Sequence, residues 1–337
     1  MTDSSLPTVA VCIVTYDSAA DLPGCLAAVA ALEHRPLDLV IVDSASSDGS
    51  LELARTAAPP GIPLTVVSLA ENVGFAGGMN AALARTSAPF VLTLNADARP
   101  EPAYVGRLLA RMAAPALRVG AVTGRLVRPA EADDREGNRR LDACGMRLTL
   151  TWRHLDRGSG EVDRGQLGVP ERVFGATGAA SLFRREALLD AAVDGEVFDP
   201  LFHSFREDAE LCFRLRERGW EVLYEPAAIA VHRRFNLPER RAAMPPAVNF
   251  HSLKNRYLLR IYHQTGRNLA LTLLPCLARD LLALGYVALR EPSSWAAYAW
   301  LWRHRAAAWR RRREIAARRT RPAAELDHWF WRSGERL

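Results

Sequence analysis

The chain has 337 residues, of which 49% are hydrophobic and 24% are charged. This length suits one large α/β domain with an appendage or two modest domains, and the composition excludes a generally disordered protein. Residues 246–337 carry 17 basic and 6 acidic side chains, a net charge of +11, whereas residues 1–245 carry 27 and 32, a net charge of −5. The tail rather than the body is therefore expected to meet an anionic partner.

The first residues, Met1–Pro7, contain neither a basic segment nor an apolar one, so we expect no secretory signal and a cytoplasmic location. The five cysteines are scattered without Cys-x-x-Cys spacing, which argues against a disulfide framework and fits a reducing compartment.

Four short apolar runs near the start of the chain predict buried strands, because each is continuous and rich in β-branched residues. They are Val9–Val14, Leu37–Val42, Leu64–Val67 and Phe90–Leu94. Segments with helical apolar spacing lie between them, including Leu22–Leu32 and Leu51–Ala57. This order predicts an α/β fold with a doubly wound, mostly parallel sheet and helices on both faces.

Polar residues follow each predicted strand, at the edge where doubly wound sheets bind ligands. These polar sets are Thr15–Asp17, Asp43–Ser44, Glu71–Asn72 and Asn95–Asp97. Asp97 could hold Mg²⁺ or Mn²⁺ beside a diphosphate, or could cap the turn before Pro100. Asp43 could accept a hydrogen bond from a nucleobase, or could be a surface residue before the Asp48-Gly49 turn.

A glycine-rich segment, Asn72–Asn80, is predicted to be a loop that enters a helix at Ala81–Arg85. Such loops let backbone N–H groups approach a phosphate or a sugar closely. The segment is neither Gly-x-Gly-x-x-Gly nor a Walker loop, which argues against dinucleotide-binding and P-loop proteins.

Ser204–Leu211 place three acids before or within a predicted helix, Ala209–Arg218. Ser204 and Glu207 fit a capping box, and acids in a first turn complement the helix dipole. Alternatively, Glu207 or Asp208 faces a cleft as a general base.

His232 follows a strand-like run, Trp220–Tyr224, and a second apolar run, Ala227–Val231. This histidine is either a structural residue or a metal ligand. After Pro245–Pro246 the composition changes to long helices rich in Leu, Ala, Arg and Trp, so we place a domain boundary there. Residues 1–245 are predicted to form the domain that carries the ligand site, and residues 246–337 a basic, Trp-rich helical extension.

Residues 269–289 nearly reach membrane-spanning length, but Pro275 and the central Arg279-Asp280 pair argue against a spanning helix. Tryptophans interleave with arginines in the segment that follows, which suits the headgroup layer of an anionic bilayer. The alternative is a helix pair packed on the body with a solvated basic face. No nucleic-acid-binding motif accompanies these arginines, so we expect no nucleic-acid partner.

Seven motifs together resemble the family 2 glycosyltransferases of the GT-A fold, particularly the rhamnosyltransferase-like branch, over residues 8–235. They are Ile13–Tyr16, Val42–Ser50, Asn72–Asn80, Leu94–Asp97, Gly175–Ala180, Arg206–Leu211 and Val231–His232. The resemblance implies an inverting enzyme that moves a sugar, with rhamnose a candidate, from a dTDP- or UDP-sugar to a hydroxyl. It also implies a divalent metal cofactor, a glycan or polyprenyl-linked acceptor from cell-envelope polysaccharide assembly, and a peripheral place at the inner face of the cell membrane.

The resemblance further implies roles for single residues. Seven of them match positions that bind the nucleotide sugar: Thr15, Tyr16, Asp43, Asn72, Gly74, Asn80 and Asn95. The others match the metal ligands Asp97 and His232, the catalytic pair Glu207 and Asp208 with Asp208 as base, and the acceptor-side residues Gly175, Thr177 and Gly178.

Two residues depart from the family's pattern. Asn95 stands where the family's Asp-x-Asp has its first acid, which leaves fewer charges on the metal. Glu210 replaces the second Asp of Glu-Asp-x-Asp-Leu, while Asp208 is retained.

Two other classes of protein use similar elements. A nucleotidyltransferase would carry a glycine-rich loop with Arg or Lys directly after the first strand, where this chain has Thr15–Ala19. A non-catalytic nucleotide-binding scaffold with a degenerate transferase fold is the remaining alternative. The joint presence of Asp97, Asp208 and His232 argues against it.

Overall fold

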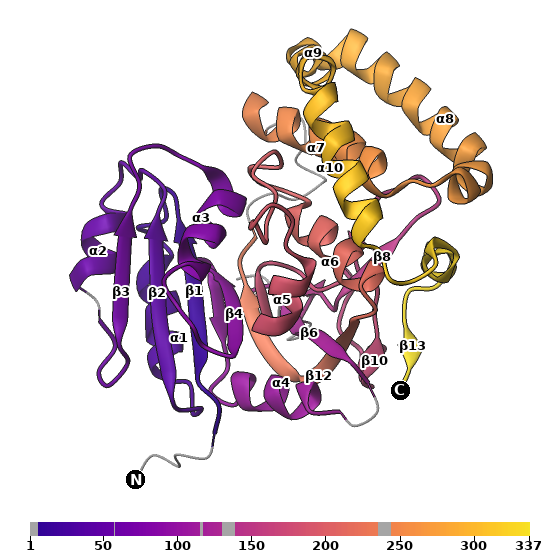
Figure 1. Cartoon of the computed structure of the whole chain (residues 1–337). Coiled ribbons are helices and arrows are strands. Elements are labelled where there is room, and N and C mark those ends of the chain that lie inside the picture. The colour runs from indigo at the N-terminus through magenta and orange to yellow at the C-terminus, as the bar shows by residue number, and fades with distance from the viewer. Residues whose placement is uncertain (1–5, 57, 115–116, 130–138, 235–243) are drawn as a thin grey trace.

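The computed structural model describes residues 6–56, 58–114, 117–129, 139–234 and 244–337. Within these residues, one mixed sheet of 11 strands forms the centre of the molecule, with helices on both faces (Figure 1). Its longest ladders are parallel. The predicted α/β fold is confirmed.

The four predicted strands form the parallel half of the sheet, in the order β4-β1-β2-β3. Their bounds are β1 (Val9–Thr15), β2 (Leu37–Asp43), β3 (Leu64–Ser68) and β4 (Phe90–Asn95). Each extends one residue past its apolar run, because ladder pairing continues into the first polar residue. The helices between them are α1 (Leu22–Ala30), α2 (Ser50–Thr56) and α3 (Gly74–Leu83).

The prediction of an open glycine-rich loop at Asn72–Asn80 is wrong, because α3 already begins at Gly74. Gly74 has a φ of 68°, and a Cβ there would lie 2.4 Å from the carbonyl oxygen of His203. A Cβ on Gly78 would lie 2.6 Å from Cγ1 of Val14 in β1. These glycines therefore let α3 pack closely against the sheet and a neighbouring loop.

The other half of the sheet is mixed. Its strands are β5 (Ala98–Pro100), β6 (Val119–Val127), β7 (Leu141–Ala143), β10 (Glu171–Arg172), β11 (Ala180–Arg184), β12 (Glu221–His232) and β13 (Glu335–Arg336). A separate hairpin pairs β8 (Met146–Leu148) with β9 (His154–Asp156). The accompanying helices are α4 (Tyr104–Met112), α5 (Arg185–Ala191) and α6 (Glu207–Glu217). The two predicted apolar runs before His232 are one strand, β12, with an irregularity between Glu225 and Ile229.

Four α-helices follow the predicted boundary: α7 (Pro246–His263), α8 (Gly266–Arg290), α9 (Trp295–Arg303) and α10 (Arg305–Arg318). Two 3-10 helices, η2 (Pro292–Ser294) and η3 (Ala323–Phe330), connect or follow them. Leu259, Cys276 and Trp329 from this region belong to the same buried cluster as residues of the sheet, and β13 pairs with β10 at its edge. The extension thus shares the core of the body, and its status as a separate folding unit stays a prediction.

Candidate active site

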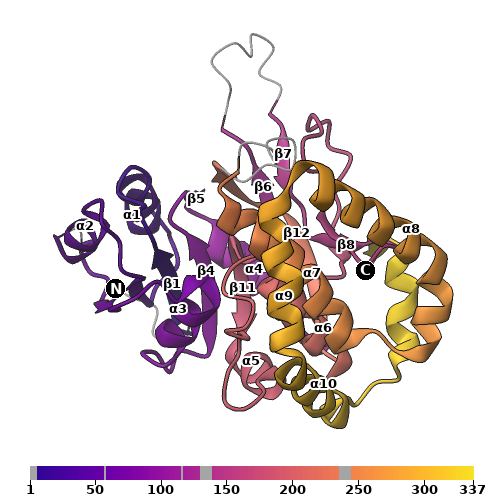
Figure 2. The same ribbon diagram turned by 90° about the horizontal axis from the view of Figure 1, so that it is seen from above.

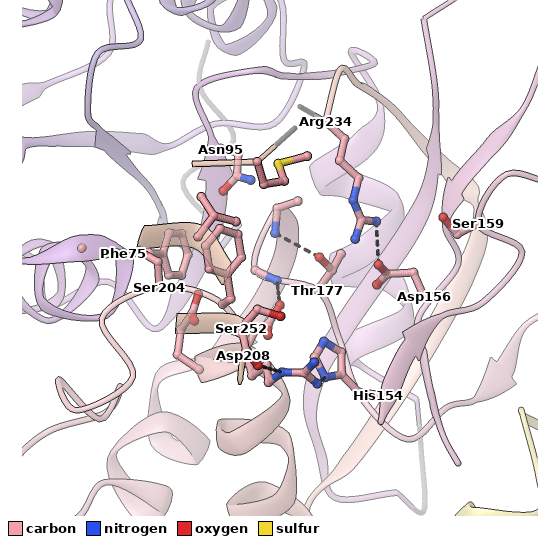
Figure 3. Close-up of a pocket in the computed structure, with 18 of the residues that line it drawn as sticks. Phe75, Asn95, His154, Asp156, Ser159, Thr177, Ser204, Asp208, Arg234 and Ser252 are labelled. Atoms are coloured by element: carbon pink, nitrogen blue, oxygen red, sulfur yellow. Dashed lines mark hydrogen bonds and ion pairs between the residues drawn. The ribbon is translucent and has the colours of Figure 1, made fainter. Parts of the chain in front are cut away.

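A cavity of about 1370 Å³ lies beyond the carboxyl ends of β1, β2 and β4 and extends to α7 and α8. This is the edge where the sequence predicts a site. Ordinary small-molecule pockets measure ~300–1,000 Å³, so this cavity has room for two substrates. Figure 3 shows Asn95, Thr177 and Asp208 around one hollow, contributed by β4, the segment before β11, and α6.

His232, the last residue of β12, lies between two carboxylates. Its Nδ1 is 2.7 Å from Oδ2 of Asp142, and its Nε2 is 3.2 Å from Oδ1 of Asp97. Burial alone would lower the pKa of His232, but hydrogen bonds to Asp142 and Asp97 raise this pKa to about 9. The ring is therefore fixed with Nε2 toward the cavity-lining Asp97.

The donor atoms of Asp97 and His232 fit a divalent cation. Asp142 accepts the proton on Nδ1. With a pKa of about 9, the ring also carries a proton on Nε2 toward Asp97, and a divalent cation would displace that proton and take the Nε2 lone pair beside a carboxylate oxygen. Asn95 places Nδ2 3.4 Å from the same Nε2. In the part of the chain that the structure describes, no group of three or more His, Cys, Asp or Glu side chains is arranged to hold a metal, so substrate oxygens and water would complete the coordination.

Asp208 lies in the first turn of α6 and faces the Gly175–Ala180 segment. One carboxylate oxygen accepts the Gly178 N–H at 3.0 Å and the other accepts the Ala209 N–H at 2.7 Å. Burial raises the pKa of Asp208 above its ordinary value, against these backbone hydrogen bonds, which lower it. The result is an oriented carboxylate with enhanced basicity at the cavity wall.

The segment before α6 has an unusual backbone, since His203, Phe205 and Arg206 all have positive φ. Nδ2 of Asn255 in α7 lies within 2.6–2.8 Å of three carbonyl oxygens in this segment, those of Phe202, Ser204 and Phe205. Asn255 is fully buried. It therefore links the helical extension to the residues that set the position of Asp208.

The predicted capping box at Ser204 and Glu207 is wrong. The N-cap of α6 is Arg206, in the left-handed region and without a side-chain cap. The Ser204 hydroxyl instead accepts the Phe75 N–H at 3.2 Å. The left-handed residues turn the chain sharply, so Ser204 cannot reach the first turn of the helix.

Glu207 lines the cavity although it is buried. Burial and the neighbouring Asp208 hold its pKa well above the ordinary value. Its Oε2 has no hydrogen-bond partner among the residues described. Of the two acids, Asp208 is thus the one held by hydrogen bonds for proton transfer.

Only part of the predicted nucleotide-sugar set reaches the cavity. Tyr16, Asn72, Gly74 and Asn95 line it, together with Asp17, Ser18 and Ser44. Thr15 and Asp43 are buried and hydrogen-bonded to each other at 2.8 Å. Asn80 bonds both backbone groups of Phe198. These three are not cavity-lining residues, and a direct contact from them to a nucleotide stays a prediction.

On the acceptor side, Thr177 and Gly178 line the cavity, whereas Gly175 packs against Cys212 of α6. The substituted position Glu210 also lies outside the cavity. Its carboxylate pairs with Arg214 at 2.6 Å and with His263 at 3.4 Å. Glu210 is therefore a buried structural residue that links α6 to α7.

Sequence reasoning missed several polar residues of the site. Asp156 and Arg234 form an ion pair at 2.6 Å on the cavity wall (Figure 3). Arg234 also lies 3.4 Å from Asp142, which joins this pair to His232. Asp142 and Asn255 lie far along the chain from the residues they hold. Asp142 gave a local signal, as a polar residue between Leu141 and Ala143, whereas Asn255 stands between Lys254 and Arg256 and gave none.

The mixed, mostly parallel sheet with flanking helices and an acid-lined cavity at its strand ends is an α/β arrangement of the GT-A type. Residues 10–190, more than half of the chain, match the family described as Glycosyl transferase family 2. The chain belongs to this family and is a family 2 glycosyltransferase. The match ends before Asp208 and His232, so the roles of these two residues stay predictions.

The chain is similar in sequence to one curated protein and in fold to several solved structures. Over 108 residues it is 32% identical to the succinoglycan biosynthesis protein ExoU of Rhizobium meliloti (strain 1021), a match that covers 32% of each protein. The chain thus matches about a third of that relative's length. The mannosyltransferase PcManGT from Pyrobaculum calidifontis, solved with GDP-Man and Mn²⁺, is 19% identical with a TM-score of 0.52, over 98% of this chain and 89% of that one. GalNAc-T7, solved with UDP, GalNAc and Mn²⁺, is 14% identical with a TM-score of 0.58, over 78% and 49%.

Proposed function

We propose that the chain transfers a sugar from a nucleoside diphosphate donor to an acceptor hydroxyl, with inversion at the anomeric carbon. The observation that carries the proposal is that a hydrogen-bonded carboxylate, Asp208, lines the same cavity as the Asp97–His232 pair. A base and a site for the leaving diphosphate are both needed for a single displacement.

Asp208 acts as the general base. The acceptor oxygen attacks the anomeric carbon while the bond from that carbon to the diphosphate oxygen breaks, and Asp208 takes the hydroxyl proton. The backbone N–H groups of Gly178 and Ala209 fix its two oxygens, and its raised pKa favours acceptance of a proton. No covalent intermediate is required.

Asp97 and His232 are the residues that would hold a Mg²⁺ or Mn²⁺ ion. Such an ion supplies positive charge against the leaving diphosphate. Asp142 keeps the His232 ring oriented. Asn95 lies beside the same ring and is a neutral group at the position of the first acid in the family's Asp-x-Asp motif. The Mn²⁺ in the two similar solved structures supports this assignment.

The donor we propose is a dTDP- or UDP-sugar, with rhamnose as a candidate sugar. Tyr16 is exposed at the cavity wall, where its ring can stack on a nucleobase. The UDP in the GalNAc-T7 structure supports a pyrimidine nucleotide, while the GDP-Man of PcManGT makes guanine the competing choice. The likeness to ExoU supports a place in polysaccharide assembly, with a glycan or polyprenyl-linked acceptor at the cell envelope.

Thermal unfolding of the purified chain with UDP, dTDP, GDP and ADP, each with Mn²⁺, Mg²⁺ or EDTA, tests the donor site. A ligand at 100 times its Kd stabilises the folded state by ~2.7 kcal/mol. We expect UDP or dTDP to raise the Tm only with a metal. No shift with any nucleotide would contradict the proposal, and so would NMR of the product showing a retained anomeric configuration.

A further inference from the structure

Helix α8 carries an apolar surface that none of the described residues covers. Ten large side chains on this helix are between 38% and 82% exposed: Leu269, Leu271, Leu273, Leu274, Leu277, Leu281, Leu282, Leu284, Tyr286 and Leu289. We call this set the α8 surface. In both overall views α8 lies at the rim of the molecule (Figures 1 and 2). Single exposed leucines are common, but a contiguous set of this size marks an interaction site.

The opposite face of α8 is attached to the body. Asp280 forms ion pairs with Arg256 and Arg260 of α7 at 2.7 and 2.6 Å. Near its start, Thr272 accepts the indole N–H of Trp152 at 3.1 Å. By length and composition α8 could cross a membrane, and only 17% of its most apolar window is buried. Its ion pairs with α7 instead hold it along the surface of the folded body.

The chemistry beside the α8 surface favours an anionic lipid bilayer over a second copy of the chain. Residues 246–337 carry a net charge of +11, and two copies meeting through this face would bring like charges together. The helices that follow α8 carry exposed tryptophans, Trp295 and Trp302 in α9 and Trp309 in α10, and Arg305 lies over the Trp302 ring at 4.3 Å. Tryptophan prefers the headgroup layer of a membrane, and each arginine near an anionic surface adds ~1 kcal/mol of attraction.

The cavity reaches the same helix. Arg279, Leu282 and Tyr286 of α8 line it, and these side chains are also exposed. The cavity is therefore bordered by the α8 surface as well as by Asp97 and Asp208.

We propose that the α8 surface docks on an anionic lipid bilayer, so that the acceptor enters the cavity from the membrane interface. An amphipathic acceptor would keep its lipid part at the bilayer and extend its hydroxyl-bearing head toward Asp208. The docking itself is independent of catalysis. The route of the acceptor rests on the transferase function proposed above.

Vesicle sedimentation tests the docking. The full chain is mixed with vesicles of phosphatidylcholine alone or with added phosphatidylglycerol. We expect binding to the anionic vesicles, weaker at high salt, and weak binding to the neutral ones. The triple change Leu274→Glu, Leu281→Glu and Leu289→Glu removes three of the most exposed side chains and should weaken anionic-vesicle binding at least tenfold.

The control is Leu189→Glu on α5, a leucine that is also more than half exposed but lies outside α8; it should bind vesicles like the unchanged chain. Equal vesicle binding by the triple variant would overturn the proposal. A second result would also overturn it. In that result the unchanged chain does not bind vesicles but forms a dimer without lipid, detected by light scattering, and the triple change dissociates this dimer. Nucleotide stabilisation in solution reports the donor site separately, so failure of the docking and failure of the transferase function give different results.

Discussion

Nδ1 of His232 lies 2.7 Å from Oδ2 of Asp142, on the side of the imidazole opposite Asp97. Asp142 is fully buried and also lies 3.4 Å from Arg234. A carboxylate behind a histidine fixes the tautomer and the ring orientation and makes the other nitrogen a better metal ligand. Asp142 is thus a positioning residue for the proposed metal site.

Replacing Asp142 by Asn should weaken Mn²⁺ binding by ~10–100-fold, as loss of such a partner does in other histidine sites. The measurement is a Mn²⁺ titration by electron paramagnetic resonance with saturating nucleotide. Asp163→Asn, which breaks a different ion pair, with Arg125, should leave the affinity unchanged. Equal Mn²⁺ affinity in the Asp142 variant would exclude the positioning role.

Replacing Asp208 by Asn should leave nucleotide binding intact and lower kcat by ~10²–10⁴, the usual contribution of a general base. The amide can still accept one backbone N–H but cannot take a proton from the acceptor. Thermal shift with nucleotide and metal gives the binding, and product formation gives kcat. The control is Asp190→Asn, the same substitution at a carboxylate that pairs with Arg218 outside the cavity, and it should leave kcat unchanged. Transfer at the unchanged rate would remove Asp208 from the role of base.

Replacing Asn255 by Asp places a carboxylate against the three carbonyl oxygens that Asn255 now holds. Repulsion should displace the segment before α6 and lower kcat at least tenfold, while nucleotide affinity stays within about twofold. A lower kcat with unchanged nucleotide affinity would indicate that Asp208 is misplaced, whereas a general loss of folding would lower both quantities. Asn268→Asp is the control, because Asn268 uses its side-chain oxygen to accept the Thr265 N–H and a carboxylate can do the same. A parallel loss of nucleotide affinity would contradict the assignment.

Glu210 should make the folded state sensitive to acid. Burial alone would raise the pKa of Glu210. The charge of Arg214 and hydrogen bonds from His263 and Arg214 outweigh this effect and lower the pKa from an ordinary 4.5 to about 2. A lowered folded-state pKa means that the stabilisation is complete above pH 4.5 and is lost as the pH falls toward 2.

Glu210→Gln leaves Arg214 buried without its counter-charge and should cost ~3–5 kcal/mol of unfolding free energy at pH 7. The difference from the unchanged chain should shrink below pH 4.5. Urea unfolding at a series of pH values measures this. Glu52→Gln, at an exposed pair with Arg55, should change stability little. A pH-independent difference at Glu210 would show that its charge is not the cause.

The strands and their polar ends could be read from the sequence because both depend on local patterns. A continuous apolar run predicts a buried strand, and the next residue lies at the binding edge whatever the rest of the chain does. Asp97 and Asn95 reached the cavity for this reason. Asp43 also follows an apolar run, but it is buried and hydrogen-bonded to Thr15. The sequence does not reveal whether such a residue faces the cavity or a neighbouring strand.

Other features depend on contacts between distant segments. Asp142 is 90 residues from His232, and Asn255 lies about 50 residues from the carbonyl groups it holds. The capping box failed because Phe205 and Arg206 take left-handed conformations, a strain that the packing of α7 against this segment supports. Local propensity contains no information about either arrangement.

The cavity has walls from two parts of the chain. Tyr16, Asn72 and Asp97 come from the first hundred residues, whereas Leu282 and Tyr286 come from α8. If the acceptor enters past α8 as proposed, changes at Leu282 or Tyr286 should alter which acceptor is used and leave nucleotide binding unchanged. Related enzymes could diversify their products by exchanging these helices while inheriting one donor, provided that the contact of Asn255 with the segment before α6 is kept.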